Sequence, residues 1–404
     1  MNVVALRSPA AGGQLSPVPG CDIARVEIFH DFAAAEPCWR ELEGGKTLAT
    51  PYQRYDFLRL WQRHIGQPAG VQPFIVVAFN AAGTPLFLWP FGRRQWYGLK
   101  IVEFLGGKHA NFNMGLWRRD AAAGIGAAEL RAVLPLFAGR ADVLKLVNQP
   151  LTWSGTTNPL AALEHQPSAN FGFSGALSAD FEALLRAHTN SATRKKMRKK
   201  EHALARHGAV RFERATAPCE IRRVLDAFFK QKSARMRMLG LPDAFASPDV
   251  RRFIEAAATE QTPAGEPAIE LYALAVDDII VATMGGIVGN GRFCGMFNSI
   301  LPNRFAAEST GEQLLVNLVR RSCERGLTTF DLGIGESRYK TLFCSDVEPL
   351  FDTFLPCSAA GRLIAVAYKL AAAGKRVIKQ RPALWSLVTS LRRLRARLAP
   401  GPGL

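Results

Sequence analysis

The stretch FDLGIGESRYK (330–340) gathers several side chains that take part in acid–base chemistry. It contains, in order, Asp331, Gly333, Gly335, Glu336, Tyr339 and Lys340. A phosphate-binding loop needs a glycine directly before its lysine, and a dinucleotide fingerprint needs a third glycine before a helix, so neither template fits. The stretch predicts a strand end, a sharp departure through the glycines, and a tyrosine able to protonate a leaving group. On spacing alone, a turn with a half-buried Tyr339 is the simpler interpretation.

The segment AAESTGEQ (306–313) predicts the start of a helix with small side chains. These include Ser309, Thr310 and Gly311. Free backbone N–H groups at a helix start bind anions, and small side chains let a pyrophosphate approach closely. Arg304 would add a counter-charge, whereas Glu308 would oppose an anion if it faced the site. An ordinary Ser/Thr-capped helix is the alternative.

A loop in the first half, GGKHANFNMGLW (106–117), gathers His109, Asn111 and Asn113 among apolar residues. Clustered polar side chains on a loop bind polar substrates, so these residues are candidate contacts of an acceptor. Asparagines also serve turn-rich connections for backbone reasons, which leaves a structural explanation open.

Two segments account for the excess of basic residues. Lys and Arg number 51 against 34 Asp and Glu, a net charge of +17. Residues 191–211 hold eight basic residues and one acidic residue, and residues 361–404 hold ten basic and none acidic, so 7 + 10 gives the whole excess. A neutral folded body with a basic helix and a basic tail explains this pattern.

The basic run TRKKMRKKEHALARHG (193–208) predicts a helix between the two halves. Basic clusters bind nucleic acid, but this run has no aromatic residue to stack on bases. A solvated helix near an anionic ligand fits better.

The tail segment 381–398 has a leucine-rich stripe and ends in arginines, which is typical of a helix on an anionic membrane surface. Packing of this segment on the protein body is an equal alternative.

The spacing of cysteines, histidines and apolar residues limits which metal sites, disulfides and membrane segments the chain can have. The seven cysteines form no CxxC pair and the seven histidines no HExxH motif, so we expect no metal and a reducing compartment. The first twenty residues lack the apolar core of a signal peptide, and no apolar run reaches the roughly 18 residues of a membrane span. The sequence predicts a cytoplasmic protein.

The order of predicted elements repeats in the two halves of the chain. In each half a meander of strands precedes a helix and a further strand: 73–106, 126–138 and 141–147 first, then 268–300, 309–325 and 328–333. We therefore expect an α/β fold of two similar units. The predicted organisation is a leader (1–20), a first domain (21–170), a connection with the basic helix (171–208), a second domain (209–360) and a basic helical tail (361–404).

With these motifs, residues 25–360 resemble the CelD-like acyltransferases of the GNAT (N-acetyltransferase) superfamily. This bacterial group is linked to cellulose and exopolysaccharide synthesis and is related to the Fem-type transferases. The resemblance is most specific in RFCGMFNSI (292–300), ESTGEQLL (308–315) and GLTTFDLGIGESRYKTLF (326–343). The basic run and the loop 106–117 also look like segments of that group.

The resemblance implies tandem GNAT-like domains, each a mixed, mostly antiparallel sheet flanked by helices, with acyl-CoA bound by the second. It implies that the pyrophosphate contacts Ser309, Thr310 and Gly311, with Arg304 nearby, and that the thioester lies against Phe297, Asn298 and Ser299. It also implies that Tyr339 protonates the departing thiolate. The glycine-rich pyrophosphate signature of such enzymes is reduced here to Gly311.

The predicted function is acyl transfer from acyl-CoA to an amine, or less readily a hydroxyl, of a cell-envelope or polysaccharide-related acceptor. Asp331 or Glu336 is the candidate base, and Lys340 joins the loop residues as a candidate acceptor contact. The acceptor would be a small molecule or a glycan- or lipid-linked group lying between the halves. Open alternatives are a Fem-type enzyme that uses aminoacyl-tRNA and a non-catalytic assembly factor; a nucleic-acid-binding module is the least favoured.

Overall fold

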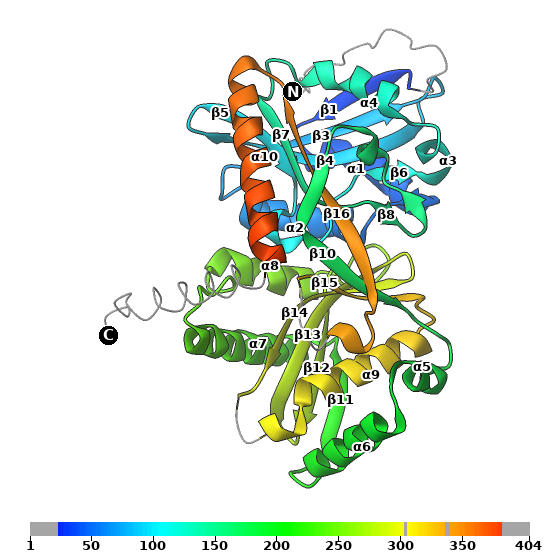
Figure 1. Ribbon diagram of the computed structural model, residues 1–404, viewed down its shortest axis with the longest axis vertical. Helices are drawn as coiled ribbons and strands as arrows, with labels where there is room; N and C mark the ends of the chain where they lie inside the picture. Colours follow the sequence, from blue (N-terminus) through cyan, green and yellow to red (C-terminus); the bar gives the residue numbers. More distant parts are fainter. Residues whose placement is uncertain (1–22, 303–304, 336–339, 382–404) are drawn as a thin grey trace, which may run out of the picture.

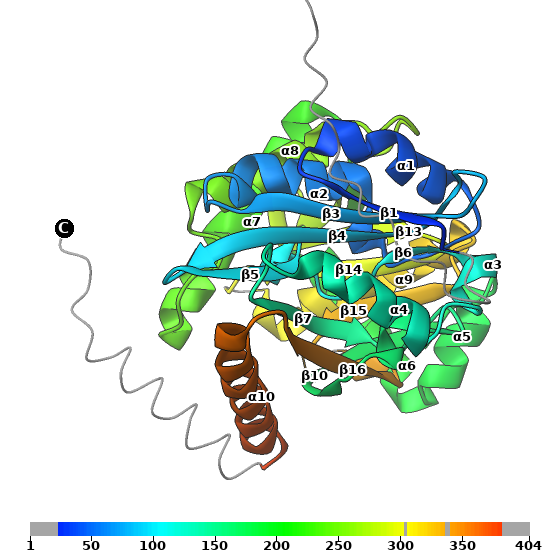
Figure 2. The same cartoon turned by 90° about the horizontal axis from the view of Figure 1, so that it is seen from above.

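The computed structural model describes residues 23–302, 305–335 and 340–381. One twisted sheet runs the length of the elongated molecule, with helices packed along its faces (Figure 1). Figure 2, taken from above, shows α10 standing at one side of the upper half, apart from α1 and α2.

The strands of the first half are β1 (Arg25–Phe29), β2 (Thr47–Leu48), β3 (Gln72–Phe79), β4 (Pro85–Trp96), β5 (Leu99–Phe104), β6 (Leu116–Arg118), β7 (Val143–Pro150), β8 (Thr152–Trp153), β9 (Thr156–Thr157) and β10 (Gln166–Ala176). Those of the second half are β11 (Val210–Ala215), β12 (Glu270–Val276), β13 (Ile279–Gly289), β14 (Arg292–Ile300), β15 (Thr329–Ile334) and β16 (Asp346–Pro356). The α-helices are α1 (Phe32–Gly44), α2 (Tyr55–Trp61), α3 (Arg119–Ala122), α4 (Ala127–Val133), α5 (Phe181–His188), α6 (Ser191–Ala205), α7 (Pro218–Leu239), α8 (Pro248–Thr259), α9 (Thr310–Glu324) and α10 (Ala359–Gln380).

The two halves have the same strand pattern, which confirms the predicted fold class. In the first, β1, β3, β4 and β5 are antiparallel neighbours, and β5 pairs in parallel with β7. In the second, β11, β12, β13 and β14 are antiparallel neighbours, and β14 pairs in parallel with β15. A parallel partner requires a crossover connection, which α9 supplies in the second half.

The long strands β10 and β16 are exchanged between the halves. β10 follows the strands of the first half but pairs with β15, while β16 follows β15 but pairs with β7. The two strands also pair with each other, so the sheet continues from β1 to β11. The halves are therefore joined by backbone hydrogen bonds, and neither has a complete sheet without the other.

Helix α10 is part of the folded body, although its residues lie within the segment that the sequence assigned to a tail. Ala365 and Tyr368 pack against Phe354 of β16, with the two aromatic rings 5.8 Å apart. Of segment 381–398, only Arg381 lies in the described part of the chain. No helix within the described ranges is both long and apolar enough to cross a bilayer.

Candidate functional site

The sheet splits open between β14 and β15, where the candidate site lies. The two strands pair only from Arg292 opposite Thr329 to Cys294 opposite Asp331. Beyond that point β14 is bulged, because Gly285 and Gly286 of β13 pair with Phe297 and Gly295 and leave Met296 without a partner. A bulge bends its strand and re-aims nearby groups. Phe297 to Ser299, where the family resemblance implies that the thioester lies, therefore follow directly after a bulge.

Three side-chain nitrogens bind the carbonyl groups of the splayed strands. Asn111 Nδ2 donates to the carbonyl oxygen of Gly295 at 3.1 Å, and Lys232 Nζ to that of Asn298 at 3.1 Å. Lys340 Nζ donates to the last carbonyls of β15, those of Gly333 (3.2 Å) and Ile334 (3.0 Å). The split is thus an ordered polar cleft rather than a frayed sheet edge.

Two neighbouring cavities follow the split. The smaller, about 190 Å³, is lined by Asn111, Lys232, Lys340 and both strand ends. The larger, about 440 Å³, extends along β14 to the start of α9. Met284 and Asn298 line both cavities. The two cavities therefore adjoin at these residues, between the start of α9 and the split.

The start of α9 supplies backbone donors to the larger cavity. Its intrahelical bonds begin with the N–H groups of Glu312 and Gln313, which both donate to the Ser309 carbonyl. The N–H groups of Thr310 and Gly311 precede these bonds, and both residues line the cavity with Ser309. Helix-terminal N–H groups and the helix dipole favour an anion at this position.

Lys200 of the basic helix α6 reaches this helix start. Its ammonium donates to Ser309 Oγ at 2.5 Å and lies 3.5 Å from Glu312 Oε2. Arg235 of α7 also lines the larger cavity. The sequence assigned the counter-charge to Arg304, which lies outside the described residues. Lys200 and Arg235 were missed at this helix start, and Lys232 at β14, because each lies more than 60 residues from its neighbours there and the sequence gives no signal of the contact.

Glu308 turns away from the larger cavity. One carboxylate oxygen lies 3.6 Å from His207 Nε2, and the side chain is 13% exposed. The residue is absent from the cavity lining. From the sequence, Glu308 would oppose a bound anion if it faced the site. Because its side chain does not face this cavity, that opposition is not expected.

Ser299 and Phe297 line the two cavities in different ways. Ser299 Oγ donates to Gln231 Oε1 and shares a hydrogen bond with Thr283, both at 2.7 Å. The ring of Phe297 packs against Phe228, with centroids 4.5 Å apart. Both side chains are held by partners within the protein, and both residues line the cavities where the resemblance implies that the thioester lies.

Asp331 lies in a buried ion cluster rather than at either cavity. Arg292 Nε donates to its Oδ2 at 3.0 Å, and the same guanidinium binds Glu348 at 2.8 and 2.7 Å. Asp331 is fully buried, and burial raises the pKa of its carboxyl while Arg292 opposes the rise. Since the guanidinium holds this carboxylate, we assign it to positioning the end of β15.

The glycines of the opening stretch do provide the departure from β15. Gly333 and Gly335 have φ of 70° and 91°, a region that glycine adopts without strain. A Cβ atom on Gly333 would lie 2.4 Å from Asn111 Nδ2, inside the split. Glu336 and Tyr339 lie outside the described residues, and Lys340, directly after Tyr339, lies in the cleft.

Of the loop residues in the first half, Asn111 alone among the three candidates reaches the cleft. His109 accepts a hydrogen bond from Trp61 Nε1 at 3.2 Å and packs on Phe253, and burial lowers its pKa to about 4. Asn113 is buried and donates to the Val147 carbonyl at 3.0 Å. His109 and Asn113 therefore have structural roles in this loop, the alternative to substrate binding that the sequence left open.

Burial lowers the pKa of the Lys340 ammonium from 10.5 to about 8, which predicts a pH dependence of stability. Below pH 8, Lys340 is charged in both the folded and the unfolded chain, so folding bears the full cost of burying the charge. Between pH 8 and 10.5 the folded chain loses this proton while the unfolded chain keeps it, so the free energy of unfolding rises with pH. In urea unfolding at stepwise pH, wild type should gain stability relative to Lys340→Met across this interval. A constant difference between the two proteins would contradict the assignment.

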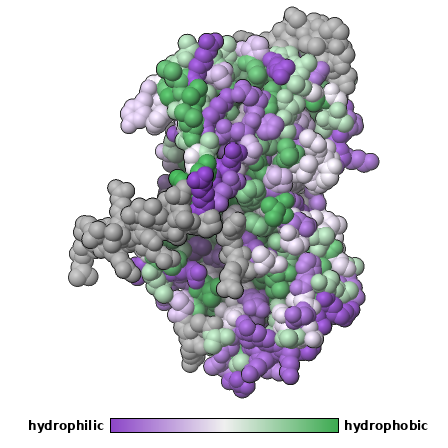
Figure 3. All heavy atoms as spheres, viewed as in Figure 1, coloured by the Kyte–Doolittle hydropathy of each residue, from purple (hydrophilic) through white to green (hydrophobic). Residues whose placement is uncertain are grey.

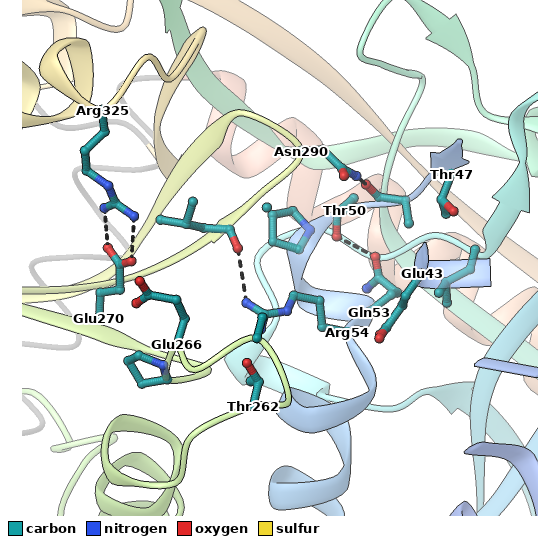
Figure 4. Close-up of a pocket in the computed structure, with 17 residues that line it drawn as sticks. Glu43, Thr47, Thr50, Gln53, Arg54, Thr262, Glu266, Glu270, Asn290 and Arg325 are labelled. Atoms are coloured by element: carbon teal, nitrogen blue, oxygen red, sulfur yellow. Dashed lines mark hydrogen bonds and ion pairs between the residues drawn. The ribbon is translucent and has the colours of Figure 1, made fainter. Parts of the chain in front are cut away.

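A further cavity of about 320 Å³ lies between the halves (Figure 4). Its charged groups are already paired: Arg325 binds both oxygens of Glu270 at 2.7 and 2.9 Å, and Arg54 donates to the Val288 carbonyl at 3.1 Å. Glu43 accepts a hydrogen bond from the backbone N–H of Tyr55. We therefore interpret this cavity as a polar seam that joins the halves, and place the functional site in the split.

Comparison with known proteins identifies the part of the chain that contains the split. Residues 191–341, from α6 to just beyond β15, match the family model described as the acetyltransferase (GNAT) domain. The chain therefore contains a GNAT-type domain, and the site lies within it except for Asn111. A comparison with curated proteins gives no match.

Two solved structures cover most of this chain with a similar fold. That of FemX has a TM-score of 0.55 at 11% identity and covers 82% of this chain and 98% of FemX. A protein of unknown function from Bacteroides thetaiotaomicron has a TM-score of 0.50 at 10% identity, covering 81% of this chain and 99% of that one. The C-terminal domain of a putative lysylphosphatidylglycerol synthetase from Agrobacterium fabrum has a TM-score of 0.49 at 13% identity, covering 85% and 96%. The predicted relationship to Fem-type transferases is therefore confirmed at the level of the fold, which this chain shares with FemX.

Proposed function

We propose that this protein transfers an acyl group from acyl-CoA to an amine, or less readily to a hydroxyl. The observation that carries the proposal is the pair of adjoining cavities along β14, one at the start of α9 and the other at the split between β14 and β15. A pyrophosphate would bind the N–H groups of Thr310 and Gly311, with Lys200 as counter-charge. The pantetheine arm would follow β14, which brings the thioester to the bulge at Met296.

At the split, the chain's own groups would orient the reacting centre. Asn111 and Lys340 hold the two strand ends apart, and Lys340 presents an ammonium to the smaller cavity. Attack by the acceptor needs donors at the thioester carbonyl and a proton for the departing sulfur. We assign the proton to Tyr339, which directly precedes Lys340. The new C–N or C–O bond replaces the C–S bond, the acceptor nitrogen or oxygen loses one proton to water, and the thiolate leaves as the protonated thiol of CoA.

We further propose that the acceptor belongs to the cell envelope or to polysaccharide synthesis, in line with the resemblance to CelD-like enzymes. The acceptor would enter from the first half, because Asn111 of that half reaches the thioester end of the cleft. The proposed location is the cytoplasm.

A Fem-type reaction with aminoacyl-tRNA is the second candidate. It is favoured by the exposed basic side chains of α6, the helix that also sends Lys200 to the start of α9. An RNA backbone would be attracted to this basic helix surface. The two reactions are separable, because release of free thiol requires acyl-CoA and the Fem-type reaction requires charged tRNA.

The test is a thermal-shift titration with CoA, acetyl-CoA and longer acyl-CoAs, followed by measurement of thiol release. Binding to the folded state raises the melting temperature by mass action. Lys200→Gln should weaken CoA binding about tenfold, the effect of losing one hydrogen bond to a charged group. Lys199→Gln changes an exposed lysine next to it and should bind CoA as wild type does. No shift with any CoA derivative would reject the proposal.

A further inference from the structure

The outward face of α10 is apolar and has no partner among the described residues. Its exposed side chains are Leu363 (77%), Val366 (54%), Leu370 (68%) and Val377 (43%). Their spacing of three, four and seven residues places them along one stripe of the helix. The opposite face, with Ala365 and Tyr368, packs against β16. An exposed apolar stripe of this length indicates an interaction surface.

Cations flank this stripe and acidic residues are absent from it. Segment 359–381 contains Arg362, Lys369, Lys375, Arg376, Lys379 and Arg381, and no Asp or Glu. Arg362, Lys369 and Arg376 are seven residues apart, so they form a row beside the apolar stripe. Lys369 is paired with Glu164 at 2.5 Å. Figure 3 shows apolar and strongly polar side chains side by side where α10 crosses this face of the molecule.

We propose that α10 is a membrane-docking surface that lays its apolar stripe into an anionic lipid interface. Leucine and valine side chains would enter the boundary between headgroups and acyl chains, while the flanking arginines and lysines reach the lipid phosphates. Each cation near an anionic surface adds to the attraction. The inference is independent of the acyl-transfer site, since α10 lines neither cavity of the split.

The charge pattern favours lipid over a second copy of the chain. Apolar residues at positions 363, 366, 370 and 377 would also suit a paired helix, but such a pair needs opposite charges beside the seam. Here every charged residue of α10 is basic, and the sequence after Arg381 adds four arginines and no acidic residue. Two such helices repel each other, whereas an anionic bilayer neutralises both the helix and the chain that follows.

The test is co-sedimentation of the full-length protein with vesicles of equal parts phosphatidylcholine and phosphatidylglycerol. For Leu363→Gln/Leu370→Gln we expect the partition constant to fall about tenfold or more, since both apolar anchors are lost. Arg362→Gln/Arg376→Gln should also weaken binding, and wild type should bind pure phosphatidylcholine only weakly. Met238→Gln changes a side chain that is 74% exposed on α7 and should leave vesicle binding unchanged.

Two results would overturn the proposal. One is wild-type vesicle binding by the leucine double variant, which would place any membrane contact outside α10. The other is a change of that variant from dimer to monomer in analytical ultracentrifugation, with vesicle binding unchanged, which would identify the stripe as a contact between copies. Both leucines are exposed, so the melting temperature should stay at the wild-type value and separate loss of docking from loss of folding.

Discussion

Replacement of Arg292 by methionine should lower the free energy of unfolding by about 3–5 kcal/mol, the range measured when one partner of a buried ion pair is removed. Arg292 is 6% exposed and is the shared counter-charge of Asp331 and Glu348. Its guanidinium also lies 3.9 Å from the ring centre of Trp153 in the first half. Methionine would leave two carboxylates together, one of them fully buried, without the guanidinium that they share.

The matched control is Arg211→Met on β11. Arg211 lies 3.6 Å from Asp278, and their side chains are 48% and 102% exposed, so this pair should contribute about 1 kcal/mol or less. Urea unfolding of both variants at neutral pH measures the difference. A second comparison at lower pH is diagnostic: protonation of the stranded Asp331 should remove part of the deficit of Arg292→Met, because burial raises the pKa of that carboxyl. Equal losses in the two variants would contradict a structural role for the cluster.

The sequence predicts those parts of the fold that depend on local patterns. Short apolar runs separated by the turns Asp277-Asp278 and Gly289-Asn290-Gly291 define the meander β12–β14, and Gly326, with a φ of 70°, ends the helix before β15. The start of α9 is also a local feature, because small residues at a helix start leave N–H groups accessible whatever packs around them. These signals lie within a few residues of the structure that they specify.

The exchange of β10 and β16 could not be predicted in this way. Each strand pairs with a strand far away in the sequence, and neither a turn type nor a periodicity predicts such a pairing. The same reason explains Asp331: a carboxylate after a strand has the sequence pattern of a catalytic base, and only the guanidinium of Arg292, 39 residues away, shows that it is paired. Asn111 shows the reverse case, since its loop was predicted but its contact with Gly295 depends on the packing of the two halves.

For Tyr339→Phe we expect turnover to fall by about 10²–10⁴, the usual contribution of a positioned proton donor, with little change in CoA affinity. The phenol would protonate the departing thiolate, a step that occurs after CoA is bound, so its loss should lower kcat rather than binding. The described geometry on either side supports this position: Gly333 and Gly335 turn the chain away from β15, and Lys340 lies in the smaller cavity.

The control is Tyr97→Phe, which removes a phenol that is 89% exposed in the first half and should leave turnover unchanged. Single-turnover release of thiol from acyl-CoA, with CoA affinity measured in parallel by calorimetry, distinguishes a chemical role from a binding role. Full turnover in Tyr339→Phe would mean that another group protonates the departing thiolate. Lys340 is then the nearest candidate, because its ammonium lies at the split and its pKa of about 8 suits donation to a thiolate near neutral pH.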